Sequence, residues 1–278
     1  MQGDFVGRTI HYILERQCRS GGFCFYRLEE PNGADTYFAL ATLHLLGKKI
    51  DDSHTLQFLK NAQASDGSYH NPYQAYYAFK GLKYLGSRPR HDPRPYLRDQ
   101  LQHFTAKNST SETALKRLDY LTDLCKELNI VIPPRPLENI VDFIMGCRNE
   151  DGGFGKPAST LLSSAYATRI LKRLATSTDS SGVLKFLKSC ENSVHGFLNV
   201  PDMAPSFLEH IHAGLTISRL LEYLPRHLDA CYQFIVGCQD PNGGFARISH
   251  GLPSLADTFL AIHSLTILEA LGETPPLS

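Results

Sequence analysis

The strongest constraint on the fold of this chain is a turn that recurs between helix-forming segments. It consists of two glycines and a phenylalanine, and it occurs at residues 21–23, 152–154 and 243–245, with a variant at residues 66–69. Glycine supplies the positive φ that a turn between antiparallel helices needs, and the aromatic side chain can fill the space between adjacent helix pairs. A recurring helical hairpin predicts a repeat architecture, because each pair needs a neighbour to cover its apolar faces.

Aligning the chain on these turns gives six helical hairpins with a period of roughly 45 residues, in the range of helical-pair repeats. The segments predict helices because apolar residues recur three and four positions apart, as in Ala261, Leu265 and Leu268. We find no strand pattern of any length, and the third hairpin lacks the Gly-Gly-Phe turn. We therefore predict an all-α chain with a single domain over residues 1–278 and repeats near 8–47, 52–86, 94–128, 137–175, 181–224 and 227–271.

Composition narrows the class of protein. The 28 basic and 28 acidic residues give a net charge of zero, which argues against nucleic acid as a partner because such proteins favour a basic surface. We find no apolar run near twenty residues and a charged, amphipathic start, so we expect neither a transmembrane segment nor a signal peptide. Seven cysteines without a CxxC pair lead us to expect a reducing, cytoplasmic setting.

The repeat resembles that of protein prenyltransferase β subunits and the related squalene-type terpene cyclases. The resemblance rests on a helix, then Gln or Cys four residues before Asp/Asn-Gly-Gly-Phe, then a second helix of small and apolar residues, and it covers about residues 8–272. It implies an α6/α6 toroid, with parallel inner helices, antiparallel outer helices and a central apolar cavity that holds an isoprenoid. The repeat is specific to the fold and says much less about chemistry.

The functional residues of both families are mostly missing at the matching positions. In the prenyltransferases an Asp-x-Cys pair and a His bind zinc, and the corresponding positions here are Pro205, Phe207 and Asp257. Residues 191–205 lack the Arg and Lys that hold the diphosphate. The cyclases place a general acid before an Asp-Thr pair, where this chain has Ala34 and Ala256. We therefore predict no zinc cage and no assured cofactor, although zinc or magnesium stays open.

A polar position survives in the second helix of each hairpin. Counting four residues back from a shared alanine gives Asp35, Gln74, Thr110, Ser163, Glu209 and Asp257. One interpretation is helix capping, because such residues satisfy free N–H groups and complement the helix dipole. The other is catalytic: Asp35, Glu209 and Asp257 would supply a general acid, a metal ligand or a polar anchor at the mouth of a lipid-lined cavity, where burial raises the pKa of a carboxyl group.

Histidines and aromatic residues supply the candidates for substrate binding. His210 and His212 lie two apart and point about 200° from each other on a regular helix, so we interpret them as partly buried, hydrogen-bonded side chains without a shared metal. Cys147, Cys190 and Cys238 occupy equivalent places in different repeats, so we interpret them as small buried side chains. The aromatic residues of the second helices would either line an isoprenoid cavity or form ordinary core; they are Tyr37, Phe38, Tyr76, Tyr77, Tyr166 and Phe259.

The sequence thus leads to one preferred function and two alternatives. The preferred one is an isoprenoid-handling enzyme that transfers or cyclises a prenyl diphosphate or polyene without the usual zinc triad. The first alternative is a catalytically silent toroid that binds a lipid or a protein partner, and the second is a β-like subunit of a heterodimer. An enzyme would lose turnover when Asp257 or Asp35 becomes Asn, whereas a binding protein would retain a lipid without turnover.

Overall fold

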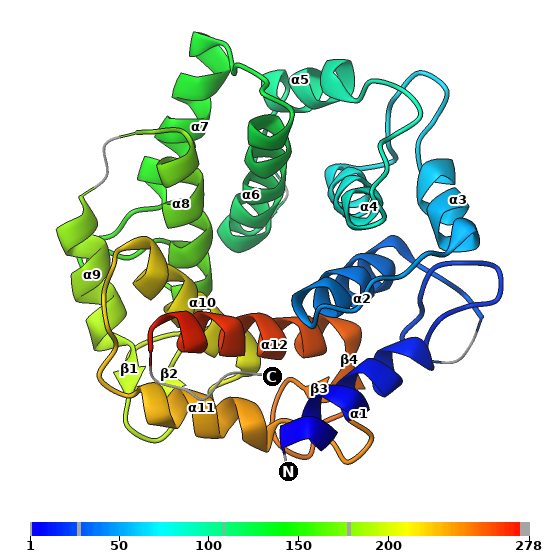
Figure 1. The fold of residues 1–278 in the computed structure, drawn as a ribbon. Coiled ribbons are helices and arrows are strands. Elements are labelled where there is room, and N and C mark those ends of the chain that lie inside the picture. Colours follow the sequence, from blue (N-terminus) through cyan, green and yellow to red (C-terminus); the bar gives the residue numbers. More distant parts are fainter. Residues whose placement is uncertain (1, 27–28, 108, 177–178, 273–278) are drawn as a thin grey trace.

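The structure is a computed structural model that describes residues 2–26, 29–107, 109–176 and 179–272. In these residues the chain alternates between two sets of helices (Figure 1). The first set is α1 (Gln2–Leu14), α3 (Ser53–Asn61), α5 (Arg94–Gln102), α7 (Pro134–Gly146), α9 (Ser180–Ser189) and α11 (Leu228–Gly237). The second set is α2 (Gly33–Leu45), α4 (Pro72–Tyr84), α6 (Ser111–Glu127), α8 (Leu161–Arg173), α10 (Leu208–Leu220) and α12 (Leu255–Ala270).

The second set forms a closed inner ring. Each of these helices packs on the next one along the chain, and α12 returns to pack on α2, while the first set lies outside (Figure 1). Closure removes the exposed ends that an open stack of hairpins would leave uncovered. The fold is therefore the predicted all-α toroid. No helix in the described ranges is both long and apolar enough to cross a membrane.

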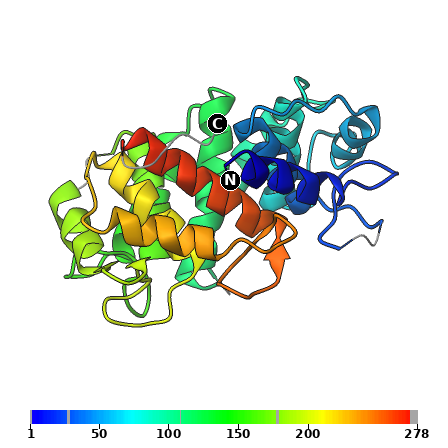
Figure 2. The same cartoon turned by 60° about the horizontal axis from the view of Figure 1, so that its bottom comes forward.

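The first and last hairpins join to complete the ring. In Figure 2, α1 lies beside the segment that connects α11 to α12. Thr9 donates a hydrogen bond from Oγ1 to the Gly243 carbonyl oxygen at 3.0 Å. Gly244 leaves room for the Tyr12 ring, since a Cβ on this glycine would lie only 2.3 Å from the ring. The glycines of the last turn are thus required for close packing on the first helix.

The recurring turn sets the spacing between the two layers. Its aromatic residue is buried in every hairpin that has one, as Phe23, Tyr69, Phe154, Phe197 and Phe245. The expectation of no strand was wrong in detail, because two turns form short antiparallel ladders. These are β1 (Glu191–Asn192) with β2 (Gly196–Phe197), and β3 (Phe245–Ala246) with β4 (Pro253–Ser254). A strand of two residues is too short to show the alternating pattern by which strands are predicted.

The hydrophobic core lies between the inner and outer helices. It joins inner-ring residues such as Leu115 and Leu171 to outer residues such as Ile140 and Leu187, all fully buried. Because the aliphatic side chains of the inner helices point outward to this core, their opposite faces are left to line the interior of the ring. That interior face carries the candidate site.

Candidate functional site

All six inner helices begin at the same end of the ring. Tyr73, in the first turn of α4, donates a hydrogen bond to the carbonyl oxygen of Thr113 in the first turn of α6. The N–H of Leu161, which starts α8, bonds to Asn199 in the segment before α10, and that of Leu208, which starts α10, bonds to Arg247 before α12. The helix N-termini therefore lie side by side, and residues at the same distance from a helix start lie at about the same depth.

The N-cap residues show that two of the six residues in the predicted polar ring, Thr110 and Glu209, do not occupy the equivalent position. The side chains of Asn32, Asn71, Thr110, Thr160 and Ser254 each accept a hydrogen bond from the N–H three residues later. Asp35, Gln74, Ser163 and Asp257 thus occupy equivalent third positions. Thr110 does not, because it is itself the N-cap of α6, and Glu209 lies one residue before the equivalent place. The alanine chosen as the reference is displaced in α6 and α10, which shifted both assignments.

Asp35 and Asp257 share one environment on neighbouring helices. Asn32 donates to Asp35 at 2.5 Å, and Ser254 donates to Asp257 at 2.6 Å. These bonds are those of capping residues. Burial nevertheless raises the pKa of both carboxyl groups, and the bonds only partly oppose it. Burial raises the pKa of Tyr12 to about 12, and the Asp257 and Asp35 carboxylates add to this rise.

Glu209 has a different partner from the two aspartates. Its carboxylate accepts a hydrogen bond from Arg247 Nε at 2.7 Å, and the guanidinium stacks on the Phe207 ring. His210 lies next to it, and its Nδ1 accepts a hydrogen bond from the Phe207 N–H at 3.1 Å. His210 therefore caps α10, which lacks a side-chain acceptor at its first residue. In the described residues, the ring contact of His210 is with Phe207, and the Glu209 charge, after burial, raises the pKa of Asp257.

Most of the predicted aromatic residues form one continuous surface, here called the aromatic wall. The Tyr37 ring lies 5.5 Å from Tyr76, 5.6 Å from Tyr77 and 5.9 Å from Phe259, measured between ring centroids. The surface spans α12, α2, α4 and α6, and sequence reasoning missed its member on α6. Its members are Tyr37, Phe38, Tyr76, Tyr77, Tyr120 and Phe259.

The side chains of the aromatic wall are surrounded by protein but are not all fully buried. Burial raises the pKa of Tyr76 and Tyr120 well above its usual value, which shows that protein atoms surround both hydroxyl groups. Both side chains still keep part of their surface accessible. Side chains that are surrounded by protein and still keep accessible surface are expected where a wall lines an enclosed space. Among the described residues, every ring contact and ion pair between inner helices joins neighbours in the ring, so none of these contacts bridges the interior.

A charged wall on α6 and α8 faces the same interior and was not predicted. Asp119, whose side chain is only 5% exposed, accepts hydrogen bonds from Arg169 at 2.6 Å and from Arg173 at 2.7 Å. Tyr166, a predicted substrate contact, lies under the Arg169 guanidinium, 5.1 Å from it. Tyr166 therefore belongs to the charged wall. The interior that we expected to be apolar is apolar on one side only.

His212 and His263 join the two walls. His212 Nε2 lies 2.8 Å from His263 Nδ1, so the two rings share one hydrogen bond. The His263 ring in turn stacks on Phe259 of the aromatic wall, with centroids 5.5 Å apart. Burial and the positive charge of nearby arginines lower the pKa of both, that of His263 to about 4, so the pair is neutral at pH 7. The prediction of a hydrogen-bonded His212 holds, but its partner was missed.

A period in the sequence could have identified several polar residues of the ring interior. Lys80, Lys116, Arg169 and His263 each lie two positions after the alanine used to align the repeats. A polar residue on the same helix face in four repeats is not expected of a helix that is buried all round. The aliphatic residues that mark these helices in the sequence lie on the opposite face, which packs against the core.

The structure does not support a zinc site at the positions that the resemblance implies. Pro205 offers no side-chain ligand atom, Phe207 stacks under Arg247, and the Asp257 carboxylate accepts a hydrogen bond from the N-cap residue Ser254. Within the described ranges, no three His, Cys, Asp or Glu side chains converge as metal ligands. Burial raises the pKa of Cys147, Cys190 and Cys238, and all three thiols are free, as expected of small buried side chains.

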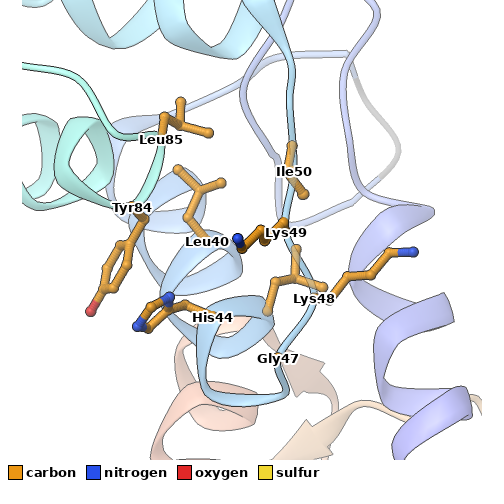
Figure 3. A pocket seen from close by; sticks show the side chains of 9 residues that line it. Leu40, His44, Gly47, Lys48, Lys49, Ile50, Tyr84 and Leu85 are labelled. Carbon is orange, nitrogen blue, oxygen red and sulfur yellow. The ribbon is translucent and has the colours of Figure 1, made fainter.

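A separate pocket of about 160 Å³ lies between the C-terminal ends of α2 and α4 (Figure 3). Leucines and an isoleucine line it together with Tyr84, His44 and two lysines. None of the predicted catalytic residues is among its lining residues. Tyr84 also contacts Tyr37, with ring centroids 6.3 Å apart, so the pocket borders the aromatic wall from the end opposite the helix N-termini.

Comparison with known proteins agrees with this architecture. Among solved structures, protein geranylgeranyltransferase-I from Candida albicans in complex with GGPP matches with a TM-score of 0.64 at 15% identity, covering 94% of this chain and 90% of that one. The type II terpene cyclase MstE from Scytonema, as a variant in complex with geranylgeranyl dihydroxybenzoate, gives 0.61 at 11% identity, covering 97% and 98%. A protein from Actinoplanes gives 0.57 at 14% identity, covering 97% and 100%. These likenesses concern the fold.

Sequence comparison identifies the family. No curated protein matches the chain. The family profile described as "Prenyltransferase alpha-alpha toroid domain" matches residues 4–156 and, in a second overlapping match, residues 96–276. Together these matches span nearly the whole of the closed ring described above. This chain belongs to the prenyltransferase alpha-alpha toroid family.

Proposed function

We propose that the interior of the ring binds an isoprenoid chain against the aromatic wall. The observation that carries the proposal is the run of aromatic side chains on adjacent inner helices, which are surrounded by protein yet keep accessible surface. Aromatic faces offer a large apolar area and attract positive charge, so they suit both a polyene and a developing carbocation. Two solved relatives in fold carry prenyl compounds, GGPP and geranylgeranyl dihydroxybenzoate, which supports the proposal.

The proposed activity is transfer or cyclisation of a prenyl diphosphate or polyene. Asp35 and Asp257 are the candidate acids, because burial raises their pKa and so favours the protonated form that an acid catalyst needs. Each would give up its proton at the N-terminal end of the ring, and its capping partner would stabilise the carboxylate that remains. Glu209 is a weaker candidate, since its carboxylate is already paired with Arg247.

Binding to the aromatic wall is tested with a neutral ligand. Geranylgeraniol should bind the wild-type protein at one site, and Phe259→Ala should weaken that binding about ten- to hundredfold, because loss of a buried phenylalanine contact costs on the order of 1.5–3 kcal/mol. Isothermal titration calorimetry gives the affinity. Phe234→Ala on α11 is the control, because this phenylalanine is also half-buried but lies on an outer helix. Equal affinities for both variants would contradict the proposed site.

The two alternative functions remain separate proposals. A silent toroid would bind geranylgeraniol as above but would convert no prenyl diphosphate or polyene. A β-like subunit would co-purify with a partner chain, which size-exclusion chromatography of the freshly isolated protein would reveal. The buried acids on α2 and α12 support the enzyme over the silent toroid, because burial raises the pKa of both carboxyl groups, and acid catalysis needs this whereas helix capping does not.

A further inference from the structure

The interior carries a row of basic side chains that the proposed chain-binding site does not use. These are Lys116 on α6, Arg169 on α8, His212 on α10 and His263 on α12, and they are here called the basic row. They lie six, nine, five and nine residues after the N-caps of their helices. Since the helices start at one end and rise about 1.5 Å per residue, these residues lie within about 6 Å of one another in depth.

Lys116 is a cation of the basic row that forms no ion pair with another described residue, although the Glu112 charge acts on it. Its side chain is half-buried, and it makes no hydrogen bond or ion pair with another described residue, although it lies 5.9 Å from the centroid of the Tyr120 ring. Burial lowers its pKa, and the charge of Arg169 lowers it further, against the opposing effect of Glu112 and Asp119. An unpaired, partly desolvated ammonium group is costly unless a ligand or water compensates it. The wall therefore presents a positive charge that is available to an anion.

The histidine pair extends this positive region. One ring donates its N–H to the other at 2.8 Å, so the pair keeps one further N–H donor and one ring nitrogen that can accept a proton. On α10, the hydroxyl group of Thr216 is buried and has no hydrogen-bond partner among the described residues. Thr216 follows His212 by four residues and so lies on the same face of α10. The pair thus has beside it a polar group whose hydrogen bonds are incomplete.

The charges that act on the pair are all positive. Burial is the larger cause of the lowered pKa of both histidines. The charges of Arg169 on α8 and Arg219 on α10 lower it further. The helices α2 and α11 also pack on α12, yet no charged group on either of them shifts the pKa of the pair. Arg169 is held by Asp119, so the arginine is fixed in place as a donor. An anion bound here would offset the positive charges that, together with burial, keep the histidines neutral.

We propose that the basic row binds the anionic head group of the isoprenoid, a diphosphate, and that the histidine pair takes up a proton when it binds. This inference rests on the proposed binding of the chain to the aromatic wall. Phe259 stacks on His263, so the wall and the basic row are continuous, and a chain lying on the wall would bring its head group to the histidine pair. The head would then lie inside the ring, where residues 191–205 at the rim lack Arg and Lys.

The test compares ligands that differ only in the head group. Geranylgeranyl diphosphate and geranylgeraniol are titrated into wild-type protein, Lys116→Met and Lys126→Met. Lys126→Met is the control, because this exposed lysine lies in the last turn of the same helix. We expect Lys116→Met to weaken the diphosphate about tenfold or more and to leave geranylgeraniol and the control within about twofold, as for loss of one charge-assisted contact. An equal effect of the two lysine variants on the diphosphate would overturn the lysine's role.

Proton uptake tests the histidine pair. Calorimetry in two buffers of different protonation enthalpy gives the number of protons bound with the ligand. We expect uptake with geranylgeranyl diphosphate at pH 7, none with geranylgeraniol, and loss of uptake in His263→Gln, whose amide can hydrogen-bond but cannot titrate. Uptake that persists in His263→Gln, or that is absent from the wild type, would overturn the inference. If neither ligand binds the wild type, the proposed function itself fails, which is a distinguishable result.

Discussion

Asp119→Asn is expected to lower the free energy of unfolding by about 3–5 kcal/mol, the cost of removing one partner from a buried ion pair. The Asp119 carboxylate is nearly inaccessible and holds two arginines from α8. Without its charge, Arg169 would lose the carboxylate that pairs with it, and Arg173 would keep its pair with Asp123. Asp119 also raises the pKa of Arg169, as expected of an anion that stabilises the neighbouring guanidinium charge.

Chemical denaturation followed by circular dichroism measures this loss. Asp99→Asn is the matched control, because Asp99 pairs with His103 on an outer helix and both side chains are more than half exposed. An exposed pair of this kind contributes at most about 1 kcal/mol. A loss below about 1 kcal/mol for Asp119→Asn would contradict the buried network, because that value belongs to surface ion pairs.

Gly152→Ala is expected to cost several kcal/mol or to prevent folding. The residue has a φ of +88°, and a Cβ there would lie 2.2 Å from the Gly182 carbonyl oxygen and 2.5 Å from its carbonyl carbon. Both are backbone atoms at the start of α9, so neither can rotate away. The turn would have to move relative to α9. This shift would disturb the packing of the buried Phe154 side chain.

The control for this variant is Gly47→Ala. Gly47 has a φ of +70° but no atom within 4 Å of its would-be Cβ. It therefore reports the cost of the left-handed conformation alone, about 1–2 kcal/mol. Thermal unfolding should show a clearly larger drop for Gly152→Ala than for Gly47→Ala. Equal drops would mean that the turn is not packed against the next hairpin as described.

Sequence predicted the toroid because its signal is repeated. The turn glycines and the buried aromatic residue after them recur in several hairpins, and each occurrence has the same physical cause. The short ladders in two of these turns were missed, since two residues carry no period. The displaced alanine in α6 was also missed, because nothing in one sequence tells a shifted repeat from a regular one. The N-cap Thr110 shows the true register only in three dimensions.

The site was predicted in part for a different reason. Aromatic residues on the second helices were recognised as candidate lining, and the structure brings Tyr37, Tyr76, Tyr77 and Phe259 together. Tyr166 was placed in the same group, but it pairs with Arg169, because the arginine three residues later lies over its ring. Charged residues on a helix usually mark its solvent side, so the interior position of Asp119 and Arg169 could only come from ring closure.

The proposal that an isoprenoid lies inside the ring can be tested by locating a bound probe. A geranylgeranyl diphosphate analogue with a photoreactive diazirine at the end of its chain would be cross-linked to the protein and mapped by peptide mass spectrometry. We predict labelling of the inner-helix segments 33–45, 72–84, 111–127 and 255–270, which carry the aromatic wall, and competition by unlabelled geranylgeraniol. Labelling confined to the outer helices, or to residues 47–50 in the loop that lines the separate pocket, would contradict the account.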